Sequence, residues 1–253
     1  MDAIIRHRVR DEFRVWKKTV VDFNRFDTKN ELLKLLLKSK DEILYKISEG
    51  YIVYRGRNLD LYDKLLDERQ MIDFLDEKTI GFDGYDAIMS GAPSKENACN
   101  GRANCEGISV LYTCNDVNTV FYELRPQINE CISIAKFVTT KQLEFADLRK
   151  NSIQKLQAND ELYQLLLYIS VEMSKPNYGG DNYIFTQYLV GHLINMGFDG
   201  MIFTSSLCPT GDNLVFFEPD DCVAKNSHLY MVDDIKINYR PVTRETVFDF
   251  YSH

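Results

Sequence analysis

The sequence predicts a mixed α/β or α+β fold, in which short strands alternate with amphipathic helices. Short segments rich in β-branched and aromatic residues, such as YIVYR and GMIFT, are bounded by turn-forming residues. Between them, apolar residues recur at helical spacing. With 253 residues and 45% hydrophobic composition, the chain has the size of one globular domain with appendages, or of one large domain.

Residues 10–49 are predicted to be helical. Phe13, Trp16 and Val20 recur at helical spacing, and a leucine- and isoleucine-rich pattern follows between residues 32 and 47. Asp27 or Thr28 is the expected cap of the second helix, and Gly50 is its expected end. The pattern predicts an amphipathic helical lobe that packs on the main domain.

The remaining elements follow from the same signals. Strands are predicted at residues 51–55, 108–112, 131–138, 200–204, 213–217 and 229–239. Helices are predicted at 60–76, from Asn115 or Asp116 to Pro126, at 154–174 and at 182–196, where Gly197 ends the last one. A long glycine-rich loop is predicted at 81–107, and such loops are usually functional or disordered.

Charge and composition narrow the class of protein. The net charge of −8 disfavours sequence-independent nucleic-acid binding, which needs clustered Lys and Arg. No apolar run is long enough to cross a membrane, and the charged N-terminus MDAIIRHRVRDEF lacks the apolar core of a signal peptide. A cytoplasmic location is therefore expected, with six reduced cysteines. A zinc site built from Cys99, Cys105 and Cys114 is the less favoured alternative, and no metal is expected.

Several polar residues stand at predicted strand ends or in the glycine-rich loop. Arg55 and Arg57 flank Gly56 where the first strand is predicted to open into a loop, and Arg102 lies in the sequence GRAN. The planar guanidinium group matches phosphate oxygens, although an arginine at a strand end is more often a surface ion-pair residue. Tyr112 ends a predicted strand, where its ring could pack or stack on a flat base.

Glu123 lies among apolar neighbours on the helix VFYELRP. From the residue pattern alone, the favoured interpretation is an exposed glutamate that pairs with Arg125 or a nearby lysine. The functional interpretation is a carboxylate held against an electron-poor sugar carbon. The loop SSLCPTGDN, which begins with Ser205 and Ser206, fits either a ligand platform or a plain hairpin connection.

Taken together, the sequence segments that contain these residues indicate one protein family. The string GRANCEGISVLYTCNDVNTVFYELRP resembles the central signature of RES domain proteins, and IFTQYLVGHLINMGFDGMIFTSSLCPTGDNLVFFEP resembles the second half of that family. YIVYRGR resembles the family's first strand and its arginine. The resemblance covers roughly residues 50–220, in the order that the family has. One departure is Ala103, where many relatives carry a large aromatic residue.

The resemblance implies a fold similar to that of ADP-ribosyltransferases, with a split β-sheet around a nicotinamide-binding cleft. Residues 50–253 would form this catalytic domain, and residues 1–49 a helical extension packed on it. Carried over by position, the catalytic residues would be Glu123, Arg55, Tyr112 and Ser205, and the NAD+-binding residues Arg102, Asn104, Arg57 and Ser206. The choice between the two serines stays open, with spacing to Asn213 slightly favouring Ser205.

The implied function is that of a toxin that consumes NAD+ as its substrate, as a glycohydrolase or a phosphorylase. A mono-ADP-ribosyltransferase that modifies a protein is the second hypothesis, and a catalytically silent NAD+- or partner-binding module is the third. The resemblance also implies an antitoxin protein as partner. The N-terminal helices are equally compatible with gating the cleft, binding that antitoxin or building a homodimer.

Overall fold

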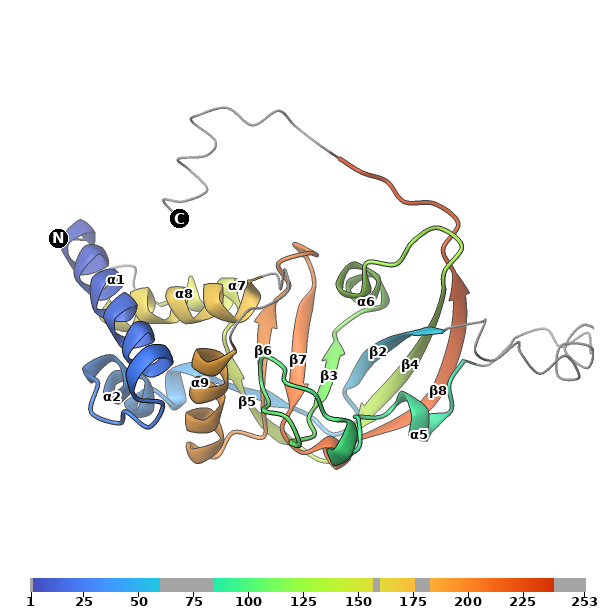
Figure 1. Ribbon diagram of the computed structural model, residues 1–253, viewed down its shortest axis with the longest axis horizontal. Coiled ribbons are helices and arrows are strands. Elements are labelled where there is room, and N and C mark those ends of the chain that lie inside the picture. Colours follow the sequence, from blue (N-terminus) through green and yellow to red (C-terminus); the bar gives the residue numbers. More distant parts are fainter. Residues whose placement is uncertain (1, 60–83, 157–159, 176–182, 239–253) are drawn as a thin grey trace, which may run out of the picture.

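The computed structural model describes residues 2–59, 84–156, 160–175 and 183–238, and in these ranges the chain is α+β, as predicted (Figure 1). One mixed sheet of eight strands runs through it. In sheet order the strands are β1 (Leu44–Ile47), β5 (Leu143–Asp147), β6 (Gly200–Thr204), β7 (Asp212–Phe216), β3 (Leu111–Cys114), β2 (Ile52–Leu59), β4 (Cys131–Thr139) and β8 (Cys222–Met231). Only the pairing of β5 with β6 is parallel among these strands.

The helices gather mainly around one half of the sheet (Figure 1). They are α1 (Asp2–Lys18), α2 (Glu31–Lys38), α5 (Ala87–Ser90), α6 (Val117–Leu124), α7 (Lys150–Ile153), α8 (Glu161–Ser174) and α9 (Ile184–Asn195). A π-helical turn, Thr19–Phe23, follows α1, and short 3-10 turns lie at Asp41–Ile43, Lys95–Asn97 and Pro219–Asp221.

The sheet is nearly divided between β2 and β3. Residue pairs join β2 to β4 along its whole length, whereas a single pair, Tyr54 with Cys114, joins β2 to β3. Beyond that pair the two strands diverge, and backbone groups that face the gap need other partners. Arg55 meets this need at one point, because its Nη1 donates a hydrogen bond of 3.3 Å to the carbonyl oxygen of Tyr112.

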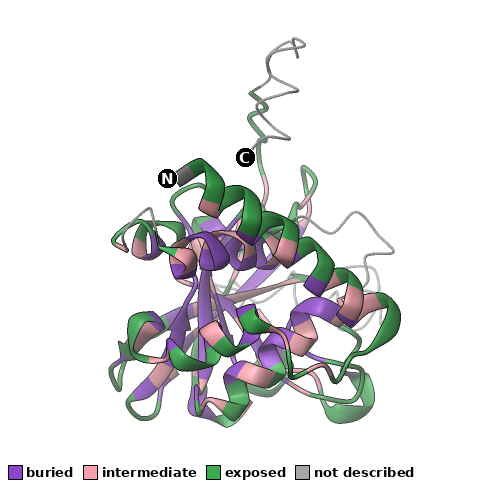
Figure 2. Ribbon diagram, turned by 90° about the vertical axis from the view of Figure 1, so that its left-hand side faces the viewer, coloured by how far each residue is buried: buried purple, intermediate pink, exposed green. Residues whose placement is uncertain are grey.

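The N-terminal helices share one hydrophobic core with α8 and α9. Trp16 has no exposed surface, and its ring packs edge-on against Phe13, Phe185 and Tyr188, with centroids 5.1 to 6.0 Å apart. Figure 2 shows α1, the helix that begins near the N-terminus, as a mostly exposed outer layer with a few buried positions. The first helix therefore contributes Val9, Phe13 and Trp16 to a core that it shares with α8 and α9. The division of the chain after residue 49 stays a prediction.

Three expectations for the N-terminal part are wrong in detail. The first helix begins at residue 2, eight positions before the expected start. Asn30 caps α2 by accepting hydrogen bonds from the backbone of Leu32 and Leu33, in place of Asp27 or Thr28. Leu44–Ile47 is the edge strand β1 paired with β5, although its apolar spacing also fits a helix. The partner strand, which lies almost a hundred residues later, decides the conformation.

Elsewhere, elements with strong local signals are confirmed. The strand β6 has the predicted bounds, β4 extends one residue further than predicted, and α6 begins after Asp116 as expected. Helices α8 and α9 fall within the predicted ranges, and Gly197 follows α9 with a φ of 82°. The described part of the loop at 84–107 is largely irregular.

Other boundaries are corrected by the structure. Strand β2 continues to Leu59, so Arg55 and Arg57 lie within a strand and not at its end. Strand β3 starts three residues later than predicted, which leaves Tyr112 inside it. Strand β8 starts at Cys222 and stops at Met231, before most of the predicted strand. Strand β5 and helix α7 were not predicted, and the helix expected at 60–76 lies outside the described residues.

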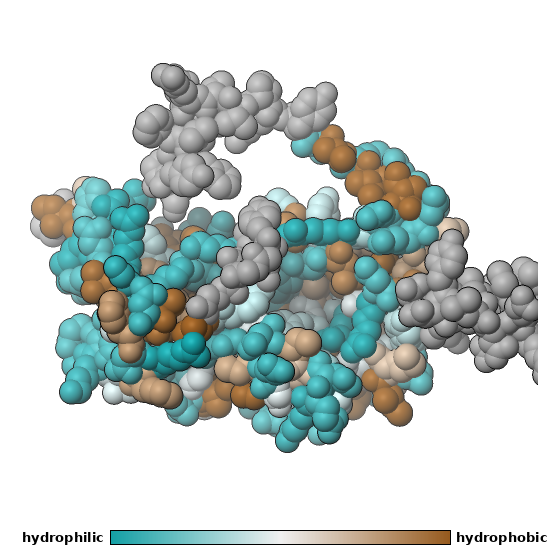
Figure 3. Space-filling view, viewed as in Figure 1, coloured by the Kyte–Doolittle hydropathy of each residue, from teal (hydrophilic) through white to brown (hydrophobic). Residues whose placement is uncertain are grey.

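The face seen in Figure 3 is mainly hydrophilic and is hollowed near its centre. Across the described ranges, every helix is too short or too polar to traverse a lipid bilayer.

Candidate active site

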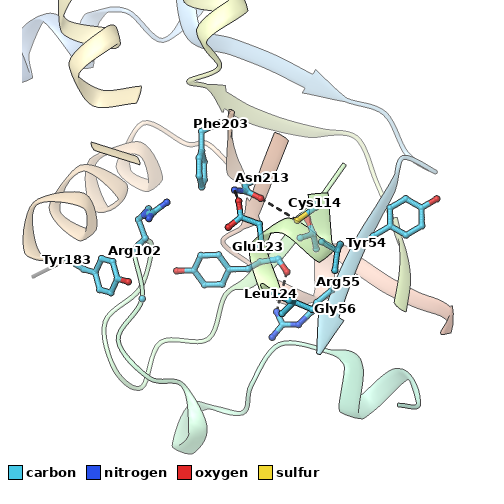
Figure 4. A pocket seen from close by; sticks show the side chains of 14 residues that line it. Tyr54, Arg55, Gly56, Arg102, Cys114, Glu123, Leu124, Tyr183, Phe203 and Asn213 are labelled. Atoms are coloured by element: carbon cyan, nitrogen blue, oxygen red, sulfur yellow. Dashed lines mark hydrogen bonds between the residues drawn. The ribbon is translucent and has the colours of Figure 1, made fainter. Parts of the chain in front are cut away.

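A cavity of about 370 Å³ opens where β2 and β3 diverge. Tyr54, Arg55 and Gly56 all line it, although successive strand residues point to opposite faces of a sheet. The cavity therefore reaches into the split between the strands. A second cavity of about 290 Å³ adjoins it and shares Arg102, Glu123 and Asn213 with it. Figure 4 shows Glu123 and Asn213 meeting at the centre, with Arg102 to one side and Arg55 to the other.

Helix α6 carries Glu123 to this position. Asp116 caps the helix by accepting a hydrogen bond of 2.9 Å from the backbone N–H of Thr119. The helix packs closely on β2 at Gly56, where an added Cβ would lie 2.3 Å from Val120 Cγ1 and 2.7 Å from Leu124 Cδ1. Only glycine permits this approach. Glu123, next to Leu124, is thereby held over the split in the sheet.

One carboxylate oxygen of Glu123 is fixed by two side chains. Ser205 Oγ and Asn213 Nδ2 each donate a hydrogen bond of 2.7 Å to Oε1. Among the described residues, Oε2 has no hydrogen-bond partner. The carboxylate is thus oriented by the protein through one oxygen, and the other is available to a ligand. Glu123 itself is exposed, because the side chain borders both cavities.

The two donors are themselves oriented. Ser205 Oγ accepts hydrogen bonds of 3.0 Å from the backbone N–H groups of Leu207 and Cys208, so its own proton is directed to Glu123. Asn213 Oδ1 accepts a hydrogen bond of 3.3 Å from Cys114 Sγ, which turns the amide nitrogen toward the carboxylate. Burial raises the pKa of the Cys114 thiol, so it stays a protonated donor.

This geometry selects between the two serines. Ser205 is buried and bonded to Glu123, whereas Ser206 is exposed and lines only the second cavity of the two. Sequence reasoning did not assign a role to Asn213. Its position at the start of a strand directly after the serine loop was the available signal.

Arg55 is a partly buried cation at the first cavity. Burial, and secondarily the charge of Arg57, lowers its pKa to about 10. Its Nε is buried without a hydrogen-bond partner, and it forms no ion pair with any described carboxylate. Such a charge is costly unless a counter-ion approaches it. Arg57 lies elsewhere, donating a hydrogen bond of 2.8 Å to the carbonyl oxygen of Gly91, and does not line either cavity.

Arg102 lies at both cavities but is partly engaged. Its Nη1 and Nη2 donate to the carbonyl oxygens of Met173 and Lys175, at the end of α8, where a cation is favoured by the helix dipole. Its guanidinium carbon lies 5.8 Å from the centre of the Phe203 ring. The residue therefore joins the glycine-rich loop to α8 while it borders the cavities.

Tyr112 and Asn104 form a fixed pair beside Arg102. The Tyr112 hydroxyl donates a hydrogen bond of 2.8 Å to Asn104 Oδ1 and accepts one of 2.8 Å from the backbone N–H of Ala103. Burial raises the pKa of Tyr112 to about 12. A Cβ on Gly101 would lie 2.5 Å from Asn104 Oδ1, so this turn requires glycine. With its hydroxyl engaged, Tyr112 offers the first cavity a neutral aromatic wall.

Asn104 does not face the cavities. Its Nδ2 donates to the carbonyl oxygens of Cys99, Cys105 and Ile108 at 2.9 to 3.1 Å, and it is 6% exposed. The amide thus helps to shape the loop, and its predicted contact with NAD+ stays a prediction.

Metal ligation finds no support in the described ranges. There, no three His, Cys, Asp or Glu side chains gather as ligands. Cys99 and Cys105 are exposed free thiols, and Cys114 is buried against Asn213.

Comparison with known proteins places these residues in a family. Residues 80–236, more than half of the chain, match the RES domain. No curated protein matches the chain by sequence. The fold is similar to a chain in the "Crystal structure of the M.tuberculosis MbcT-MbcA toxin-antitoxin complex", with 13% identity, 79% of this chain and 94% of that chain covered, and a TM-score of 0.44. The matched range contains Arg102, Glu123 and Ser205, and the chain belongs to the RES domain family.

Proposed function

We propose that this protein is a toxin-type enzyme that degrades NAD+ by cleaving the bond between nicotinamide and ribose. The observation that carries the proposal is the carboxylate of Glu123, held by Ser205 and Asn213 at the junction of two cavities. Family membership supports the same activity, because the resemblance to RES domain proteins implies an enzyme that consumes NAD+.

The chemistry needs little from the protein beyond charge and position. The C–N bond to the ribose breaks with its electron pair moving to the nicotinamide nitrogen, so the cationic ring leaves as a neutral molecule. The ribose carbon becomes positively charged, as in glycoside hydrolysis. Glu123 would stabilise that charge through its free oxygen. Water would then form the new C–O bond and release one proton, giving ADP-ribose; inorganic phosphate would give ADP-ribose-1″-phosphate.

The cationic and aromatic residues of the first cavity fit a dinucleotide. Arg55, a partly buried guanidinium without a described counter-ion, would bind the pyrophosphate, which would offset the cost of its partial burial. Tyr112 would stack on the nicotinamide ring, and Tyr54, Tyr183 and Phe203 add aromatic surface to the same cavity. Arg102, anchored on α8, would hold the dinucleotide at the entrance to the second cavity.

Product analysis tests the proposal directly. Purified protein incubated with NAD+ is expected to release nicotinamide, and mass spectrometry of the other product identifies the acceptor. Free ADP-ribose means hydrolysis, and the 1″-phosphate means phosphorolysis. Label transferred from NAD+ to a lysate protein would favour the second candidate, a mono-ADP-ribosyltransferase. NAD+ binding without any nicotinamide release would refute the enzyme proposal.

The toxin role has its own test. Expression of the wild-type chain in a bacterial host is expected to deplete NAD+ and stop growth, and the Glu123→Gln variant is expected to do neither. An antitoxin partner that occludes the cavities would restore growth. Normal NAD+ levels in a host that makes folded wild-type protein would contradict this role.

The paired serines give a matched prediction. Ser205→Ala removes one of the two donors to Glu123, and a hydrogen bond to a charged group contributes about 1.5–3 kcal/mol, so turnover should fall roughly ten- to a hundred-fold. Ser206→Ala should cost much less, because its exposed hydroxyl does not contact the carboxylate. Rates of nicotinamide release from both variants are to be compared. A larger loss at Ser206 would reverse the assignment.

The neighbouring arginines of β2 give a second matched prediction. Arg55→Met should raise the KM for NAD+ roughly ten-fold or more, since a charge-assisted bond to phosphate contributes about 1.5–3 kcal/mol. The melting temperature should change little, because losing the hydrogen bond to the Tyr112 carbonyl oxygen is offset by removing an ionised guanidinium whose Nε is buried without a partner. Arg57→Met, outside both cavities, should keep the wild-type KM. Steady-state kinetics and thermal melts check both outcomes; equal rises in KM would contradict the placement of the pyrophosphate at Arg55.

A further inference from the structure

The second cavity has a cationic lining, of which the reaction described above uses only Arg102. Three cations, Arg102, Arg125 and Lys175, border it together with Ser174 and Ser206, and Glu123 is its only carboxylate from the described residues. The whole chain carries a net charge of −8. A local excess of positive charge in an acidic protein indicates an anionic ligand.

The three cations differ in how far the protein engages them. Arg102 donates to carbonyl oxygens at the end of α8, and Lys175 Nζ lies 2.6 Å from Glu172 Oε1. Arg125, by contrast, is exposed, and its side chain has no hydrogen bond or ion pair with any residue that the structure describes. It does not pair with Glu123, which corrects the interpretation favoured by the residue pattern.

The backbone of Arg125 is also unusual. It caps α6 in the left-handed conformation, with φ 49° and ψ 52°, and Pro126 follows it. Glycine is the usual residue at this position of a helix end, because a side chain is strained there. A residue with a strained backbone thus borders the second cavity beside Glu123, and its guanidinium has no partner among the described residues. Strain of this kind is concentrated at functional sites.

We infer that Arg125 is a phosphate-binding residue and that the second cavity is a phosphate subsite adjoining Glu123. The planar guanidinium binds two phosphate oxygens at once, and the exposed hydroxyl group of Ser206 and the ammonium group of Lys175 border the same space. This inference rests on the proposed function for its substrate. The phosphate would come either from the pyrophosphate of NAD+ or from inorganic phosphate, whose oxygen would bond to the ribose carbon as the C–N bond breaks.

Two variants of Arg125 test the subsite. Arg125→Gln removes the charge, and Arg125→Gly removes the side chain while relieving the left-handed strain. The glycine variant should melt at or above the wild-type temperature, so a loss of binding cannot be ascribed to misfolding. The matched control is Arg14→Gln, an exposed arginine on α1, away from both cavities. It should match the wild type in every assay.

Kinetics distinguish the two sources of phosphate. If the subsite binds the pyrophosphate of NAD+, both variants should raise the KM for NAD+ at least ten-fold in phosphate-free buffer. If it binds inorganic phosphate, that KM should stay unchanged while formation of ADP-ribose-1″-phosphate falls at least ten-fold. Either result supports the inference. Wild-type values for both quantities in both variants would overturn it.

Calorimetry separates this inference from the proposed function. Pyrophosphate and inorganic phosphate are titrated separately into the wild-type protein and into Arg125→Gln. At least ten-fold weaker binding of either anion to the variant supports the subsite even if the wild type releases no nicotinamide. Equal affinities of both proteins for both anions overturn the subsite, whether or not NAD+ is degraded.

Discussion

Glu123→Gln is expected to reduce nicotinamide release from NAD+ by about 10²–10³-fold, which is the loss typical of removing one electrostatic stabiliser of a transition state. The amide keeps the size of the side chain but not the negative charge that faces the developing positive charge on the ribose. Its oxygen can still accept from Ser205 and Asn213, so the local structure should persist. The substitution therefore isolates the charge.

The measurement is the initial rate of nicotinamide release, made beside circular dichroism and a thermal melt to show that the variant is folded. Glu96→Gln is the matched control, because Glu96 is exposed and borders neither cavity. A folded Glu123→Gln protein with the wild-type rate would remove the central residue of the proposed mechanism.

Trp16→Ala is expected to destabilise the fold by about 3–5 kcal/mol, the range for truncating a fully buried large aromatic residue. Trp16 has no exposed surface and contacts Phe13, Phe185 and Tyr188, so its loss would leave a cavity between α1 and α9. For a chain of this size, the melting temperature should fall by about 6–20 °C.

Thermal and urea denaturation check this expectation, with Val15→Ala as the control. Val15 is the adjacent residue of α1 and is 66% exposed, so its truncation should change stability little. If Trp16→Ala melted like the wild type, the N-terminal helix would contribute nothing to the core, contrary to its packing.

Local signals explain why much of the fold could be predicted. Helix α6 has an aspartate cap and a following proline, β4 has the alternating pattern of a strand, and β6 is a short apolar run. Strand β1 has no such signal. Its four residues, Leu44–Ile47, follow two helices and have apolar spacing that a third could share, and pairing with β5 makes them a strand. A pattern of neighbouring residues does not predict pairing with a strand so distant in the sequence.

The candidate site likewise contains residues that the sequence predicts and contacts that only the structure reveals. Family resemblance pointed to Arg55, Arg102, Tyr112, Glu123 and a serine, and all of these border or contact the two cavities. Whether Ser205 or Ser206 contacts Glu123 depends on which hydroxyl the strand end directs inward, and only coordinates give that direction. Asn104 was carried over from the family resemblance of the GRAN element, and in the structure its amide nitrogen donates to loop carbonyl oxygens.

The single residue pair between β2 and β3 makes this the most weakly joined place in the sheet around the candidate site. Helix α6 packs against both strands, so it spans the seam that Tyr54 and Cys114 close. Besides this pair, the hydrogen bond from Arg55 to the Tyr112 carbonyl oxygen joins the two strands, so few interactions cross the seam while full strand ladders lie on either side. Arg55 on β2 and Asn213 on β7 therefore lie on opposite sides of the seam, and Glu123 lies on the helix that spans it.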